Sequence, residues 1–169
     1  MRACILLIIV VLGLCIDLCI QKEDYTYAKV IEVVDGDTII VEIDGRIEKV
    51  RLIGVDTPEL KAEKNKPYEY DNITNLTLLE EWGWKAKEFT ERWLKGKVVK
   101  LEFDELAGYR DRYGRMLVYV YVNGTDFNAL LLKEGYARVY LTKFKKLEQY
   151  ITLEREAFES RRGLWRFAS

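Results

Sequence analysis

The sequence contains no histidine at all. This absence removes the most common general base in enzymes, and with it every Ser–His or Cys–His nucleophile pair. It also excludes most zinc sites, because zinc in proteins is held largely by histidine and cysteine. A carboxylate is then the natural general base for any acid–base chemistry in this chain.

Cysteine is almost as scarce. Cys4, Cys15 and Cys19 are the only three, and all lie within the first twenty residues. The rest of the chain can therefore form neither a disulfide nor a cysteine-based metal site. A metal in that part of the protein must be held by oxygen ligands, which points to calcium, magnesium or manganese.

The chain also lacks an excess of positive charge. Its net charge is −1, so no overall field attracts polyanions, and a nucleic-acid-binding protein with this balance must concentrate its basic groups locally. Its 169 residues, of which 49% are apolar and 33% charged, fit a single globular domain.

Residues 1–20 are predicted to be a signal peptide or an N-terminal membrane anchor. Arg2 precedes an apolar run at residues 5–14, which continues through residues 16–20 and is broken by Asp17. The first run has the length of a signal-peptide core and is shorter than the ~20 apolar residues of a transmembrane helix. No A-x-A cleavage site follows, and the residues before Cys15 and Cys19 are not the small ones expected for lipid attachment. Each alternative predicts a domain at residues 24–169 that is secreted or at the cell surface.

The domain has the pattern of a small barrel. Apolar alternation and turn signals such as Asp44-Gly45 and Asn123-Gly124 predict five strands and three helices. The strands are expected at residues 25–34, 38–43, 48–55, 98–103 and 116–122, and the helices at residues 84–94, 127–133 and 145–162. Five short strands with a helix after the third indicate an α+β fold, a five-stranded OB-fold barrel with three α-helices, and such barrels often bind oligonucleotides.

Three polar clusters interrupt this pattern: Asp35-Gly-Asp-Thr, then Arg51 through Glu59 (RLIGVDTPE), and Arg110 through Arg115 (RDRYGR). Each alone has an ordinary explanation, as a turn, a helix start or a solvated loop.

Their combination is more informative. Asp37 begins one strand and Asp56 ends its neighbour, so antiparallel pairing can bring both carboxylates to one end of the barrel, where they need a cation between them. Arg51 lies in an apolar strand and needs a partner or a ligand. Strict alternation would place Arg51 and Asp56 on opposite faces, so the strand must bend, and Gly54 is the natural position.

In their order and spacing the three clusters resemble the signature segments of the staphylococcal nuclease family, from about Val30 to the C-terminus. The resemblance implies that Asp37, Asp56 and the Thr57 carbonyl bind Ca²⁺. It also implies a calcium-dependent endonuclease that hydrolyses DNA and RNA and leaves 3′-phosphate ends.

The resemblance assigns catalytic roles to Arg51, Glu59 and Arg115. Glu59 would orient or activate the attacking water, and the two arginines would hold the phosphate. Arg112 and Tyr113 would line the nucleotide pocket. The alternative is a non-catalytic OB-fold module that binds nucleic acid or another ligand, although relatives of that kind lose these site residues. We expect the protein to act as a monomer.

One segment departs from the family pattern. Residues 60–81 are longer than the corresponding family loop, show no clear period, and contain Lys61, Lys64, Lys66 and Tyr68. Such residues suit phosphate contact and base stacking, although a solvated surface loop fits as well. We expect the segment to be mobile, and its shortening between Lys61 and Asn75 to leave the barrel folded.

Overall fold

The strands of the protein have the alternation that the sequence predicts. In this computed structural model, which describes residues 24–168, apolar side chains such as those of Val30, Val33, Ile39 and Val41 point into the barrel and are fully buried. The strands are β1 (Tyr25–Val33), β2 (Thr38–Ile43), β3 (Arg46–Leu52), β4 (Val55–Asp56), β5 (Val98–Glu102), β6 (Met116–Val122), β7 (Thr125–Asp126) and β8 (Arg138–Val139).

Five of these strands close a barrel. The sheet order is β3-β2-β1-β5-β6-β7, and β3 also pairs with β6. The β3–β6 pairing is parallel and sets Arg51 opposite Leu117, whereas the other pairs in the barrel are antiparallel. The predicted five-stranded barrel is confirmed, and its closure brings two of the polar clusters, which are distant in sequence, together.

The third predicted strand is divided into two strands at the position of Gly54. Residues 48–55 were predicted as one strand, but β3 ends at Leu52 and β4 begins at Val55. Between them Gly54 has a φ of +74°, a conformation that favours glycine. The predicted bend is therefore confirmed, and it directs β4 to pair with β8, where Asp56 lies opposite Arg138.

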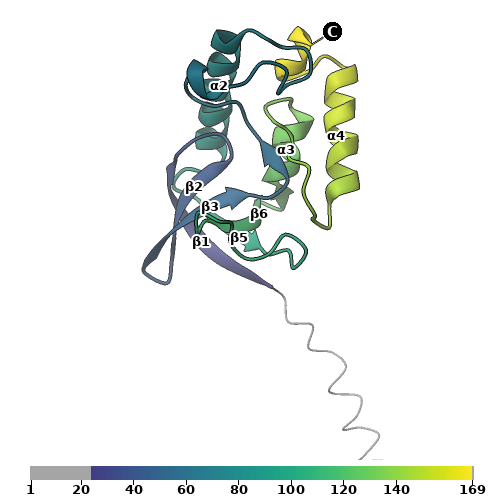
Figure 1. Ribbon diagram of the computed structural model, residues 1–169. Coiled ribbons are helices and arrows are strands. Elements are labelled where there is room, and N and C mark those ends of the chain that lie inside the picture. The colour runs from purple at the N-terminus through teal and green to yellow at the C-terminus, as the bar shows by residue number, and fades with distance from the viewer. Residues whose placement is uncertain (1–23, 169) are drawn as a thin grey trace, which may run out of the picture.

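Three α-helices cover one end of the barrel (Figure 1). They are α2 (Leu76–Leu94), α3 (Phe127–Lys133) and α4 (Leu147–Glu159), with short 3₁₀ turns η1 (Ala62–Lys64) and η2 (Gly163–Phe167). The prediction for α3 is confirmed, and the Asp126 carboxylate caps this helix by accepting a hydrogen bond from the amide of Ala129 at 3.0 Å. Helix α4 is shorter at both ends than the predicted range 145–162.

The predicted start of α2 at residue 84 is wrong. The helix begins at Leu76, because the Asn75 side chain caps it by accepting a hydrogen bond from the amide of Leu78 at 3.0 Å. Gly83, which lowers helix propensity, lies inside the helix and is buried.

Residues 60–81 have regular structure despite their lack of a clear period, because they include η1 and the start of α2. That the barrel stays folded when the segment is shortened between Lys61 and Asn75 remains a prediction. Tyr70 and Ile73 are buried with Leu79, Trp82 and Trp165 in a second hydrophobic cluster, outside the barrel core. Removing Tyr70 and Ile73 would expose this cluster. The segment is thus part of the folded domain.

Residues 1–20, the predicted signal peptide or anchor, lie outside the described residues. Within residues 24–168, no helix has the length and apolar character needed to cross a membrane.

Candidate active site

The turn between β1 and β2 carries a buried carboxylate. Asp37 is 1% exposed, and its Oδ2 accepts hydrogen bonds from the backbone amide of Thr57 at 2.8 Å and from the Thr57 hydroxyl at 3.2 Å. The Thr38 hydroxyl donates to Oδ1 at 3.1 Å. Asp35 shapes the turn by accepting a hydrogen bond from the amide of Asp37 at 3.1 Å. The first two polar clusters therefore meet directly.

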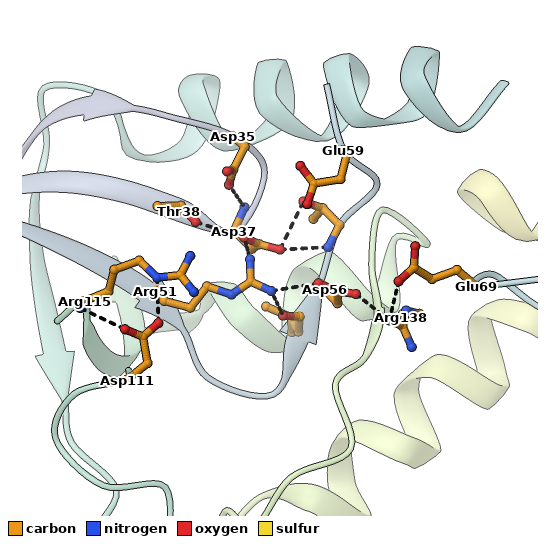
Figure 2. Close-up of polar contacts among 12 residues, drawn as sticks. Asp35, Asp37, Thr38, Arg51, Asp56, Glu59, Glu69, Asp111, Arg115 and Arg138 are labelled. Carbon is orange, nitrogen blue, oxygen red and sulfur yellow. Dashed lines mark hydrogen bonds and ion pairs between the residues drawn. The ribbon is translucent and has the colours of Figure 1, made fainter. Parts of the chain in front are cut away.

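Arg51 lies between two carboxylates (Figure 2). Its Nη1 forms an ion pair with Asp37, and its Nη2 donates to Asp56 Oδ1 at 2.8 Å and to the Val55 carbonyl at 3.1 Å. The bend at Gly54 makes the Asp56 contact possible. The prediction that antiparallel pairing brings Asp37 and Asp56 to one end of the barrel is confirmed, and the cation that separates them here is the guanidinium.

Glu59 sits on a loop that one buried asparagine fixes. The Asn65 side chain accepts a hydrogen bond from the Glu59 amide at 2.8 Å and donates to the Glu59 carbonyl at 3.0 Å. It also donates to the Lys61 carbonyl at 3.1 Å. The backbone on both sides of Glu59 is thus held.

The third cluster forms a tight turn before β6. Asp111 accepts hydrogen bonds from the backbone amide of Arg115 at 3.0 Å and from its Nε at 2.7 Å, which orients the guanidinium. Tyr113 is 68% exposed, and the guanidinium carbons of Arg112 and Arg115 lie 4.9 and 5.5 Å from its ring centroid. Tyr113 is therefore an exposed ring with two cations beside it.

Two adjoining cavities join these groups. A cavity of about 240 Å³ is lined by Asp35, Asp37, Arg51, Thr57, Pro58, Glu59, Tyr113 and Arg115. A larger one, of about 570 Å³, is lined by Arg51, Asp56, Arg112, Tyr113 and Arg115 together with Tyr140 and the Gly54 bend. All eight residues proposed from the sequence line one or both cavities.

The family described as "Staphylococcal nuclease homologue" matches residues 49–167. The chain belongs to this family. A thermonuclease of Staphylococcus hyicus is 39% identical over 147 residues, which cover 86% of this chain and 78% of that protein.

Two further relatives extend the comparison. An uncharacterized protein of Methanocaldococcus jannaschii is 45% identical over 159 residues, which cover 89% of this chain and 76% of that protein. An endonuclease of Bacillus subtilis is 36% identical over 135 residues, which cover 78% of this chain and 58% of that protein.

In this member of the family, negative charge is crowded in the smaller cavity. Burial raises the pKa of Asp35, and the nearby Arg51 guanidinium only partly offsets this. Burial also raises the pKa of Glu59, and the charges of Asp35 and Asp56 raise it further. Around Asp111 the balance is reversed, because the hydrogen bonds from Arg115 outweigh the effect of burial and lower the pKa of that carboxyl.

This crowding suits a bound cation. The available donors are carboxylate, hydroxyl and carbonyl oxygens, the ligands that hard cations such as calcium prefer. Within residues 24–168, no three acidic or other metal-ligating side chains converge closely enough to form a complete site. A calcium ion takes six to eight oxygen ligands, including backbone carbonyls and water, so the donor chemistry fits it in combination with such ligands.

Sequence reasoning missed several residues around the site. Asn65 carries no signal in the sequence, because its role depends on the path of the loop. Arg138, by contrast, does carry a signal in the sequence, because it lies between the apolar residues Ala137 and Val139, much as Arg51 lies within an apolar strand. It donates to Asp56 Oδ2 at 2.7 Å.

Proposed function

We propose that this protein is a calcium-dependent endonuclease that hydrolyses phosphodiester bonds in DNA and RNA and leaves 3′-phosphate ends. Family membership and the relatives named as nucleases support hydrolysis of nucleic acid. The observation that carries the proposal is the smaller cavity, where Arg51 and Arg115 face the carboxylates of Asp37 and Glu59. Guanidinium groups suit the binding of a phosphate, and a carboxylate beside them can act on an attacking water.

The two arginines bind the phosphate. Arg115 is held through Nε by Asp111, so its guanidinium is already oriented when substrate arrives, whereas Arg51 exchanges its ion pairs with Asp37 and Asp56 for the phosphate. A guanidinium presents a planar fork to two phosphate oxygens and remains charged at any working pH. Both therefore stabilise the negative charge that grows on the phosphate in the transition state.

Glu59 acts on the attacking water. Its carboxylate lines the smaller cavity together with Arg51 and Arg115, where it can accept the proton of a water that attacks a bound phosphate. The water oxygen forms a bond to phosphorus as its proton passes to Glu59, the P–O5′ bond breaks, and the 5′-oxygen takes a proton from solvent. The hydrogen bonds between Asn65 and the Glu59 backbone hold that backbone during this step.

Asp37, Asp56 and the Thr57 carbonyl are the residues that would hold calcium. When bound, the ion supplies positive charge beside the phosphate and favours ionisation of a nearby water. Arg112 and Tyr113 contact the nucleotide, since the exposed Tyr113 ring offers a face on which a base can stack.

The test is cleavage of plasmid DNA and of a defined RNA by the full chain, with calcium and with a calcium chelator. We expect cleavage of both in calcium, none in chelator, and products with 3′-phosphate ends. Glu59→Gln should bind nucleic acid without cutting it, and the surface variant Glu105→Gln should cut normally. Binding without cleavage by the native chain would instead identify a non-catalytic module.

The proposal also covers the cellular location and the oligomeric state of the protein. Residues 1–20 direct the domain out of the cytoplasm or anchor it at the surface, where it acts as a monomer on DNA and RNA. The domain should then be found in the medium, or protease added to intact cells should degrade it. Analytical sedimentation of the purified protein should give the mass of one chain. Full protection of a cytosolic protein would contradict the proposed location.

A further inference from the structure

The Asp56 carboxylate is held from both sides. Arg51 donates to its Oδ1 at 2.8 Å and Arg138 donates to its Oδ2 at 2.7 Å (Figure 2). Because each oxygen has its own arginine, the carboxylate cannot rotate without breaking both ion pairs. Arg51 belongs to the proposed catalytic set, whereas Arg138 comes from β8, outside both cavities.

Arg138 is in turn fixed by the segment that distinguishes this chain from the family pattern. Its Nη2 donates to Glu69 Oε1 at 3.2 Å, and its guanidinium carbon lies 5.5 Å from the centroid of the Tyr70 ring. The Tyr70 hydroxyl donates to the backbone carbonyl of Asp56 at 3.1 Å. Glu69, Tyr70 and Arg138 therefore restrain the side chain and the backbone of Asp56 together, and we call these three residues the Asp56 brace.

The brace is anchored in the second hydrophobic cluster. Tyr70 is 1% exposed, and its ring centroid lies 6.3 Å from that of Trp165. Close packing around a tyrosine buried in this way restricts its movement, so its hydroxyl donates to Asp56 from a fixed position.

Stability alone is a poor explanation for Arg138. Within residues 24–168, its Nε is buried without a hydrogen-bond partner. An unpaired buried donor costs free energy, and replacing buried ion pairs by well-packed apolar residues is often neutral or stabilising. The geometry of Arg138 is better explained by what it does to Asp56.

We propose that the Asp56 brace is a positioning unit that holds Asp56 in the orientation required to bind calcium. This inference rests on the proposed function. Its consequence is that residues 60–81, through Glu69 and Tyr70, support the proposed metal site. Outer partners of metal ligands typically change metal affinity or activity by about 10- to 100-fold when they are removed.

The positive charge of Arg138 allows a decisive test of the proposal. If Arg138 acted only as a nearby positive charge, its removal would strengthen calcium binding, because one competitor of the ion would be gone. If it positions Asp56, its removal weakens binding despite the favourable change in charge. Arg138→Met, which keeps much of the side-chain length, separates the two effects by the sign of the change.

The experiment is calcium titration by calorimetry on the native full chain and on Arg138→Met, Glu69→Gln and Tyr70→Phe. We expect affinity to fall by about tenfold or more in Arg138→Met, and by smaller factors in the other two variants. Tyr70→Phe keeps the buried ring and removes only the hydroxyl, so it remains informative if Arg138→Met does not fold. Glu105→Gln, which removes an exposed ion pair with Lys145, is the matched control and should bind as the native chain does.

Turnover provides a second readout. High calcium should restore kcat in the brace variants while KM for nucleic acid changes little, which a general loss of structure would not produce. Unchanged or tighter calcium binding in Arg138→Met and Tyr70→Phe would overturn the inference. A native chain that binds no calcium would overturn the proposed function and the inference together, whereas normal native binding with unaffected variants would overturn the inference alone.

Discussion

Gly83 in helix α2 lies directly against the backbone of Glu59. A Cβ atom at Gly83 would lie 2.5 Å from the Glu59 carbonyl oxygen and 2.7 Å from that of Pro58. Real side chains do not approach this closely, and backbone atoms cannot move aside as the end of a flexible side chain can. The helix can therefore pack on the loop that carries the proposed general base only because residue 83 has no side chain.

Gly83→Ala should reverse the usual effect of this substitution. In an ordinary helix, alanine for glycine stabilises by about 0.5–1 kcal/mol. Here we expect a loss of about 1–3 kcal/mol from overpacking, and a fall in kcat of about ten- to a hundredfold as the Glu59 loop is displaced. Chemical denaturation and steady-state kinetics measure both, with Glu88→Ala on the exposed face of α2 as control. A stabilised, fully active variant would contradict the packing described above.

Arg51→Lys and Arg115→Lys keep the charge and lose the planar fork. If bidentate contact with the phosphate matters, each should lower kcat by about 10²–10³-fold while the domain stays folded. Arg46→Lys, on an exposed part of β3, is the control and should be neutral. Near-native turnover in either test variant would remove that arginine from the proposed phosphate site.

The exposed lysines before Tyr68 offer a test of substrate contact that does not disturb the fold. Lys61 and Lys64 are exposed, and the charge of Lys64 acts on Glu59. Changing both to Gln should make the salt dependence of DNA binding shallower, by about 0.9 in log–log slope for each lost phosphate contact. The same changes at Lys49 and Lys133 should leave the slope unchanged. Equal slopes in native and test proteins would mean that this surface does not contact DNA.

Asp104 should make the domain sensitive to acid. It is 1% exposed; burial alone would raise its pKa, but hydrogen bonds from the Tyr119 hydroxyl at 2.5 Å and the Lys145 amide at 2.6 Å outweigh burial and lower it. A lowered folded-state pKa gives stability that is complete above the unfolded value of about 3.9 and is lost as pH falls through the folded value.

Asp104→Asn should therefore cost about 1–3 kcal/mol at neutral pH, because an amide donor replaces one acceptor. It should also flatten the loss of stability in acid. Urea denaturation between neutral pH and pH 3 measures both, with Asp44→Asn in an exposed turn as control. An undiminished acid slope in Asp104→Asn would assign the acid sensitivity to other groups.

Local signals were enough to predict the barrel. Strand alternation, Asx-Gly turns and the Asp126 cap each depend on neighbouring residues, so the sequence specifies them directly. The start of α2 was missed because residues 76–83 combine an apolar run with a glycine, and only the Asn75 cap marks them as helix. The burial of Tyr70 depends on Trp165, nearly a hundred positions away, and no local pattern encodes it.

The site divides in the same way. Asp37, Arg51 and Asp56 could be grouped from strand pairing alone, because register determines which ends of neighbouring strands meet. Asp111 belongs to the third cluster, but its ion pair with Arg115 was not predicted, because Arg115 was expected to contact phosphate. Asn65 and Glu69 act through the path of a loop, and their contacts appear only when that path is known.

The parallel β3–β6 pairing has a consequence for how the protein is made. A ribosome-bound chain that has emerged as far as α2 already carries Asp37, Arg51, Asp56 and Glu59, but it lacks the strand that closes the barrel and the arginine at residue 115. Pairings this distant in sequence form late in folding, because loop closure must come first. The proposed site is therefore complete only after the chain has been made as far as β6 and the barrel has closed.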